Sequence, residues 1–215
     1  MTKHRNIFLF IFIYFALLSG VVQAKTVDGG TKQKEAKIDG FRSAKFGVNE
    51  RDVMKAIFRD FKINRKKVSR EENPIEKTVS LAVNIENLLP NSGPAKVFYI
   101  LGHKTKRLIQ VNVIWGSPAT PKPDAENVVV TANQLQNHLA QKIYVKDGLA
   151  LIPLQLSEGI ILVFQGSDKK GRAVKLVLVN PKGDPEKIGK NISLTLSYIE
   201  KPNKPDVFRI KDGDF

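Results

Sequence analysis

The chain has 215 residues, 42% of them hydrophobic and 26% charged, which is enough for one domain with a core of its own. It contains no cysteine, which excludes disulfides, thiolate metal ligands and a cysteine nucleophile. Lysine and arginine outnumber the acids by 35 to 21, and the resulting net charge of +14 favours anionic partners such as membrane headgroups, acidic glycans, nucleic acid or an acidic protein face.

Residues 1–24 predict a cleavable secretory signal peptide. Lys3 and Arg5 precede an uninterrupted apolar run over 7–18, and Ala24 follows at a position that suits signal peptidase. An uncleaved anchor is the alternative, but the run is shorter than the about 20 apolar residues that a spanning helix needs. We therefore expect a mature chain that begins at Lys25, carries a charge of +12 without Lys3 and Arg5, has no transmembrane span and is periplasmic or secreted. Export without cysteine is typical of bacterial proteins.

The polar, glycine-bearing stretch 25–39 predicts a flexible linker, so we expect the folded domain to cover 40–200. Asn49 suits a helix N-cap, and acidic residues follow in the first turn. Apolar residues then recur at helical spacing over 49–61, namely Val53, Met54, Ile57, Phe58 and Phe61. This pattern predicts the first helix.

Alternating apolar residues predict three strands after this helix, over 78–85, 95–101 and 108–115, and the last two form a hairpin. Asp124 suits the N-cap of a second helix over 125–141. Shorter strands follow at 143–145, around 149–156, at 160–165, at 172–179 and at 192–199, and 201–215 is a tail that either adds an edge strand or binds a partner. The core residues that we predict are Val53, Ile57, Leu81, Val83, Val111, Val113, Leu135, Leu139, Leu176 and Leu196.

This order predicts an α+β fold in which two helices pack on an antiparallel sheet. One helix precedes each run of strands, so an internal duplication with halves 40–117 and 118–200 is a hypothesis that the order allows. The helix entry Phe46-Gly47-Val48-Asn49, continuing to Ile57, resembles the opening of the small envelope modules of the BamE/SmpA kind. Two such modules in tandem would give an architecture similar to the β-lactamase-inhibitor-protein fold. The resemblance implies a non-enzymatic module that binds other envelope proteins.

No residue pattern predicts catalysis, a metal site or a cofactor. His103 and His138 are the two histidines beyond the signal peptide, and neither has a partner at metal-ligand spacing. Neither a nucleophile motif nor a phosphate-binding loop is present. A small-ligand or lipid carrier is the alternative function, with an apolar groove lined by Phe98, Trp115 and Phe164. A hydrolase or a hydrolase inhibitor is less favoured.

Basic residues recur along the first helix and continue directly after it. On the helix their spacing places them on one side, opposite the apolar residues. This cluster is either a solvated helix face or a contact surface for an envelope protein or an anionic surface component. Nucleic acid is less favoured because no aromatic residues alternate with the basic ones. The candidate partner-binding residues are Arg51, Lys55, Arg59, Lys62, Arg65, Lys66, Lys67 and Arg70.

Overall fold

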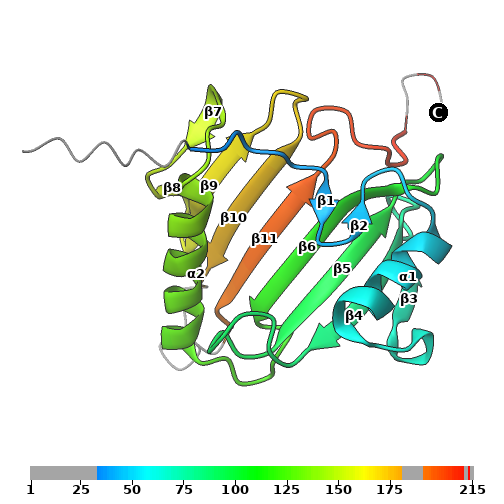
Figure 1. Cartoon of the computed structure of the whole chain (residues 1–215), viewed down its shortest axis with the longest axis horizontal. Coiled ribbons are helices and arrows are strands. Elements are labelled where there is room, and N and C mark those ends of the chain that lie inside the picture. The colour runs from blue at the N-terminus through cyan, green and yellow to red at the C-terminus, as the bar shows by residue number, and fades with distance from the viewer. Residues whose placement is uncertain (1–32, 181–190, 211–212, 214–215) are drawn as a thin grey trace, which may run out of the picture. The chain divides into compact units, whose positions relative to one another are not determined.

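The computed structural model describes residues 33–180, 191–210 and 213, so the predicted signal peptide and its cleavage site lie outside the described residues. The chain from Gln33 on forms one compact unit, and its described residues form two α-helices and a nine-stranded antiparallel sheet (Figure 1), which confirms the predicted α+β class. Its elements are β1 (Gly40–Phe41), β2 (Ala44–Lys45), α1 (Glu50–Phe61), the 3₁₀ turn η1 (Arg65–Lys67), β3 (Ser69–Glu72), β4 (Val79–Ile85), β5 (Ala95–Leu101), β6 (Leu108–Gly116), α2 (Ala125–Ala140), β7 (Val145–Ala150), β8 (Leu154–Ser157), β9 (Ile160–Ser167), β10 (Ala173–Val179) and β11 (Ser193–Ile199).

Helix α1 begins and ends where its sequence provides caps. The side chain of Asn49 accepts a hydrogen bond from the backbone N–H of Asp52, as predicted for the N-cap. Lys62 ends the helix in the left-handed conformation, and its N–H donates to the carbonyl of Phe58. Phe58, which helical spacing grouped with the apolar side of α1, is instead 54% exposed, and Nζ of Lys62 lies 5.9 Å from its ring centroid. The core side of α1 consists of Val53, Ala56 and Ile57.

Helix α2 is capped by Asp124, whose carboxylate accepts from the N–H groups of Glu126 and Asn127. Its buried stripe holds the four predicted positions and one polar residue, Thr131, whose hydroxyl donates to the carbonyl of Asn127. The stripe contacts β6, β9, β10 and β11. It comprises Val128, Thr131, Ala132, Leu135 and Leu139.

The sheet has the strand order β3-β4-β5-β6-β11-β10-β9-β7, and β8 also pairs with β9. Each half of the chain therefore contributes a helix and a run of antiparallel strands, and the last strands of the two halves, β6 and β11, pair at the centre. This arrangement matches the order that suggested a duplication, which stays a hypothesis about the origin of the chain. Figure 1 shows β3 near one edge of the sheet and β7 and β8 at the other.

Strand register separates a core face from an open face. Tyr99, Val111, Tyr198 and Val174 are successive cross-strand partners and point to the side that the helices cover. Their neighbours in sequence point the other way, to the open face, where most of them are partly exposed, including Phe98, which pairs with Asn112. All ten predicted core residues are buried, so the alternation and the helical spacing assigned the core correctly.

Residues 34–39 overturn the predicted linker. Glu35 bridges to Ile143, while Ala36 and Ile38 are buried in the core. Together with β1 and β2 they form a strap that lies over the core face of the sheet between α1 and α2 (Figure 1). The domain thus starts before Gly40, because two apolar side chains spaced two residues apart in an extended segment both reach the core.

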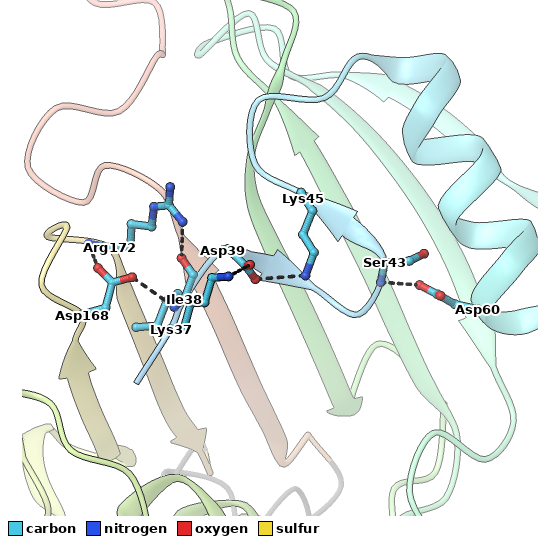
Figure 2. A network of polar contacts seen from close by, with 8 residues as sticks. All are labelled: Lys37, Ile38, Asp39, Ser43, Lys45, Asp60, Asp168 and Arg172. Carbon is cyan, nitrogen blue, oxygen red and sulfur yellow. Dashed lines mark hydrogen bonds and ion pairs between the residues drawn. The ribbon is translucent and has the colours of Figure 1, made fainter. Parts of the chain in front are cut away.

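Hydrogen bonds that are buried or partly buried hold the strap, as Figure 2 shows. The carboxylate of Asp168, 5% exposed, accepts from the N–H of Ile38 at 3.1 Å, and Arg172 donates to the carbonyl of Ile38 at 3.1 Å. At the other end of the strap, the N–H of Ser43 donates to Asp60 on α1 at 3.1 Å. The strap is therefore bonded both to the β9–β10 turn and to α1.

The remaining strand predictions need smaller corrections. The strand expected at 143–145 begins only at Val145, where β7 starts, since Ile143 instead pairs with the strap. Strand β8 begins after Pro153, which lacks the N–H that a continuous strand would need. The short edge strand β3 was not predicted, because its four residues are polar and exposed and carry no alternation.

The C-terminal tail docks on the β5–β6 turn. The carboxylate of Asp206 accepts from the N–H groups of Lys104 and Thr105 at 3.0 and 2.9 Å, and the N–H of His103 donates to the carbonyl of Asp206. The ring of Phe208 packs edge-on to His103, with 5.6 Å between the ring centroids. The tail therefore covers part of His103, which is only partly exposed.

Candidate anionic-partner interface

The eight predicted partner-binding residues come from four consecutive segments at one edge of the unit. Three lie on α1, one is its C-cap, three form η1 and one lies on β3. Every one of them is exposed. The basic surface is defined here as Arg51, Lys55, Arg59, Lys62, Arg65, Lys66, Lys67 and Arg70.

Two of these eight cations are paired with acids on α1. Lys55 lies 3.0 Å from Asp52, and Arg70 on β3 reaches back to Glu50 at 3.2 Å. Within the described residues no salt bridge involves the other six. The hydrogen bond from Lys55, together with the charges of Lys55, Arg51 and Arg107, holds the pKa of Asp52 below its ordinary value.

The local fold fixes how these side chains are presented. The sequence predicted a single basic cluster because the basic residues of the helix and those after it are consecutive in the chain. In the structure, the left-handed cap at Lys62 ends the helix and changes the direction of the chain. Arg65, Lys66 and Lys67 follow in a single 3₁₀ turn, which fans successive side chains around its axis. Arg70 projects from the core face of β3 towards α1, since it pairs with Leu81. The basic surface thus extends from the exposed side of α1 over η1 to β3.

A groove of about 720 Å³ adjoins this surface and was not predicted from the sequence. It runs between the end of α1 and the last part of β4 with the residues that follow. Its apolar lining comes from Phe61, Ile63, Val83, Ile85 and Leu88, and its polar lining from Arg42, Asp60, Lys67, Asn84, Glu86 and Asn87. Lys67 belongs both to the groove and to the basic surface. No local pattern could reveal the groove, because its lining comes from separate segments of the chain, around Arg42, from 60 to 67 and from 83 to 88.

Arg42 is one of the polar residues that line the groove. Its backbone is left-handed, with a φ of 51°, and its guanidinium carbon lies 4.9 Å from the ring centroid of Phe61. Its Nη2 also donates to the carbonyl of Leu88 at 3.5 Å, the limit of a hydrogen bond. The guanidinium is thus held largely by stacking on Phe61 and keeps donors for a further acceptor.

Behind the groove lies a buried polar group without a partner. Tyr99 is fully buried, and among the described residues its hydroxyl has no hydrogen-bond partner. Burial raises the pKa of Tyr99 strongly, the charge of Asp60 adds to this effect, and Arg42 opposes it. The hydroxyl is therefore protonated at physiological pH, and its burial destabilises the fold.

The structure does not bring together the aromatic residues expected to line a carrier pocket. Trp115 and Phe164 point into the core beneath the helices and are at most 1% exposed. Phe98 lies on the open face of the sheet, opposite to them. These three side chains therefore cannot line one groove.

The described residues offer no metal site and no membrane-spanning helix. Within 33–180, 191–210 and 213, no group of three or more His, Asp or Glu side chains is arranged to hold a metal ion, and His138 is exposed. No helix in this part of the chain is long and apolar enough to cross a membrane. Comparisons of the chain with protein-family models, with curated proteins and with solved structures give no match, so a functional hypothesis has to rest on the geometry of the basic surface and its groove.

Proposed function

We propose that this chain is an exported, non-enzymatic interaction module of a bacterial cell envelope, which binds an envelope protein or an anionic surface component through the basic surface. The observation that carries the proposal is that six exposed cations without a salt bridge within the described residues gather on rigid, consecutive segments beside a groove. The signal-like residues 1–24 and the resemblance to BamE/SmpA modules support the envelope address.

Several charges must act together for such a surface to hold a partner. An exposed ion pair contributes only about 0.2–1 kcal/mol, so a single substitution would hardly change the affinity. Salt screens these interactions, because the Debye length falls from about 10 Å at 0.1 M to about 3 Å at 1 M. We therefore expect a partner that binds at low salt and is released at high salt.

The test compares two quadruple variants of the mature protein with equal loss of charge. One replaces Arg51, Lys55, Arg59 and Lys62 by Gln. The control replaces four exposed lysines away from the basic surface by Gln, namely Lys146, Lys170, Lys201 and Lys204. Both variants should unfold with the cooperativity of the wild type, since all eight side chains are exposed.

Binding is measured by pull-down from the native envelope at low and high salt, followed by titration of the purified partner. The first variant should lose the partner and its salt dependence, while the control should retain both. Intact-mass measurement of protein recovered from the periplasm should give an N-terminus at Lys25. Retention of the partner at unchanged affinity by the first variant would mean that the basic surface is only a solvated helix face.

A further inference from the structure

Strand β4 is longer than the strand that covers its outer edge. Strand β3 pairs with it only from Val79 to Ala82, whereas β5 pairs with it along its full length to Ile85. The chain that precedes β3 leaves the sheet through η1. The last part of β4 therefore has a free edge on the side of the basic surface.

Two hydrogen bonds show which residues face this edge. The carbonyl of Ala82 accepts from the hydroxyl of Ser69 on β3, and the carbonyl of Thr78 accepts from the N–H of Asn73. Backbone groups of alternate residues face the same side of an antiparallel strand, so Asn84 presents its N–H and C=O to the free edge. Within the described part of the chain, no strand pairs with Asn84 on that side. An unpaired N–H and C=O at a sheet edge are a template for an added strand.

The groove lies directly beside this free edge. Asn84 lines it, together with Phe61 and Ile63 from the end of α1 and the segment after it. In a strand added in line with β3, the residue opposite Asn84 would point to the open face, and the residues on either side of it would point to the core face. An apolar side chain at one of these flanking positions would enter the groove over Phe61 and Ile63.

Charge decides what kind of strand fits. The added strand would run past η1, whose three basic side chains are exposed and take part in no salt bridge of the described residues. Of the two acids that line the groove, Asp60 already accepts from the N–H of Ser43. A second copy of the mature chain would bring its own net charge of +12, the +14 of the full sequence less Lys3 and Arg5, to the same place, which disfavours self-association there.

We infer that the partner is bound as an extended acidic segment that adds a strand to the free edge of β4 at Asn84 and places an apolar side chain in the groove. This inference rests on the proposed binding role and names the form in which the partner is recognised. Main-chain hydrogen bonds give such a complex its affinity, and the alternate side chains give it specificity. Acidic residues on the outward positions would meet Lys67 and its neighbours on η1.

The probe is a blocked, dye-labelled peptide of about seven residues, the length of an ordinary strand, in which glutamates alternate with valine and phenylalanine. Its binding to the mature protein is measured by fluorescence anisotropy at low salt. A second peptide carries N-methyl groups on alternate residues, which removes the N–H groups of one edge, and a third has lysine in place of glutamate. We expect binding of the first peptide, at least about tenfold weaker binding of the N-methylated peptide, and no binding of the lysine peptide.

Two substitutions at one position form the matched pair on the protein. Asn84→Pro removes the edge N–H, and proline is tolerated in strands where the N–H faces outward. Asn84→Ala keeps the backbone groups and should bind the acidic peptide as the wild type does. We expect Asn84→Pro to weaken binding of the acidic peptide at least about tenfold, because it removes one main-chain hydrogen bond and disturbs the main-chain hydrogen bonds next to it. If Asn84→Pro fails to fold, the N-methylated peptide alone decides the question.

The outcomes separate this inference from the proposed function. Binding of the acidic peptide that is insensitive to N-methylation and to Asn84→Pro, but lost in the quadruple Gln variant, would overturn strand addition and leave the basic surface as the binding site. Failure of every acidic peptide while the native partner still binds through the basic surface would also overturn it. Peptide binding that is lost on N-methylation and in Asn84→Pro, but is kept in Asn84→Ala, supports strand addition at this edge.

Discussion

Replacing Asp168 by asparagine tests whether one buried carboxylate holds the strap on the sheet. Oδ2 of Asp168 accepts from the N–H of Ile38, while Oδ1 accepts from the N–H groups of Lys170 and Arg172 at 2.8 and 3.1 Å. In Asp168→Asn the side-chain oxygen can keep the two bonds within the turn. The new amide group then faces the N–H of Ile38, and two donors oppose each other.

The expected loss of stability comes from the hydrogen bond that is removed and from the N–H of Ile38, which stays buried without an acceptor. A hydrogen bond to a charged group contributes about 1.5–3 kcal/mol, and a buried donor without an acceptor costs about 1–3 kcal/mol. Partial relaxation of the strap relieves some of this cost. We therefore expect Asp168→Asn to lower the free energy of unfolding by about 2–4 kcal/mol.

The assay is urea unfolding followed by the fluorescence of Trp115, the single tryptophan, which is 1% exposed and reports on the core. Amide hydrogen exchange at Ile38 reports on the strap itself. Asp147→Asn is the control, because it removes the same charge from an exposed position and should change stability by no more than about 0.5 kcal/mol. Equal stability of the two variants, with unchanged protection of Ile38, would refute the role assigned to Asp168.

Two further predictions concern polar groups elsewhere in the fold. Burial would raise the pKa of Asp206, but hydrogen bonds from the Thr105 hydroxyl and from the N–H groups of Lys104 and Thr105 outweigh it and lower the pKa below 3.8. The carboxylate of Asp206 should therefore stabilise the docked tail fully above pH 3.8, and this stabilisation should be lost as the pH falls through the lower pKa of the folded state. The loss would be measured as faster amide exchange at Thr105. Amide exchange at Thr105 that is unchanged in Asp206→Ala would contradict this prediction. Tyr99→Phe removes a buried hydroxyl without a partner among the described residues, so it should leave the unfolding free energy unchanged or raise it by up to about 1 kcal/mol, and a clear loss of stability would show that the hydroxyl is bonded in solution.

The sequence by itself determined the elements whose signals are local. Caps at Asn49 and Asp124 and the helical spacing of apolar residues located both helices, and strict alternation located β4, β5, β6 and β11 with their core residues. Spacing also placed the basic residues of α1 on one exposed side. These signals depend on backbone hydrogen bonds and side-chain periods that span only a few residues, so they can be recognised without knowing what packs against them.

Only the tertiary structure decided which segments become neighbours. Residues 34–39 look like a linker because most of them are polar, yet Ala36 and Ile38 are buried in the core. The hydrogen bond that holds Ile38 there comes from Asp168, far along the chain. The free edge at Asn84 exists because β3 is shorter than β4, and the groove exists because α1 ends beside that edge. Strand neighbours, strand edges and grooves arise from pairing between distant residues, and such pairing leaves no period within either segment that a reading of the sequence could detect.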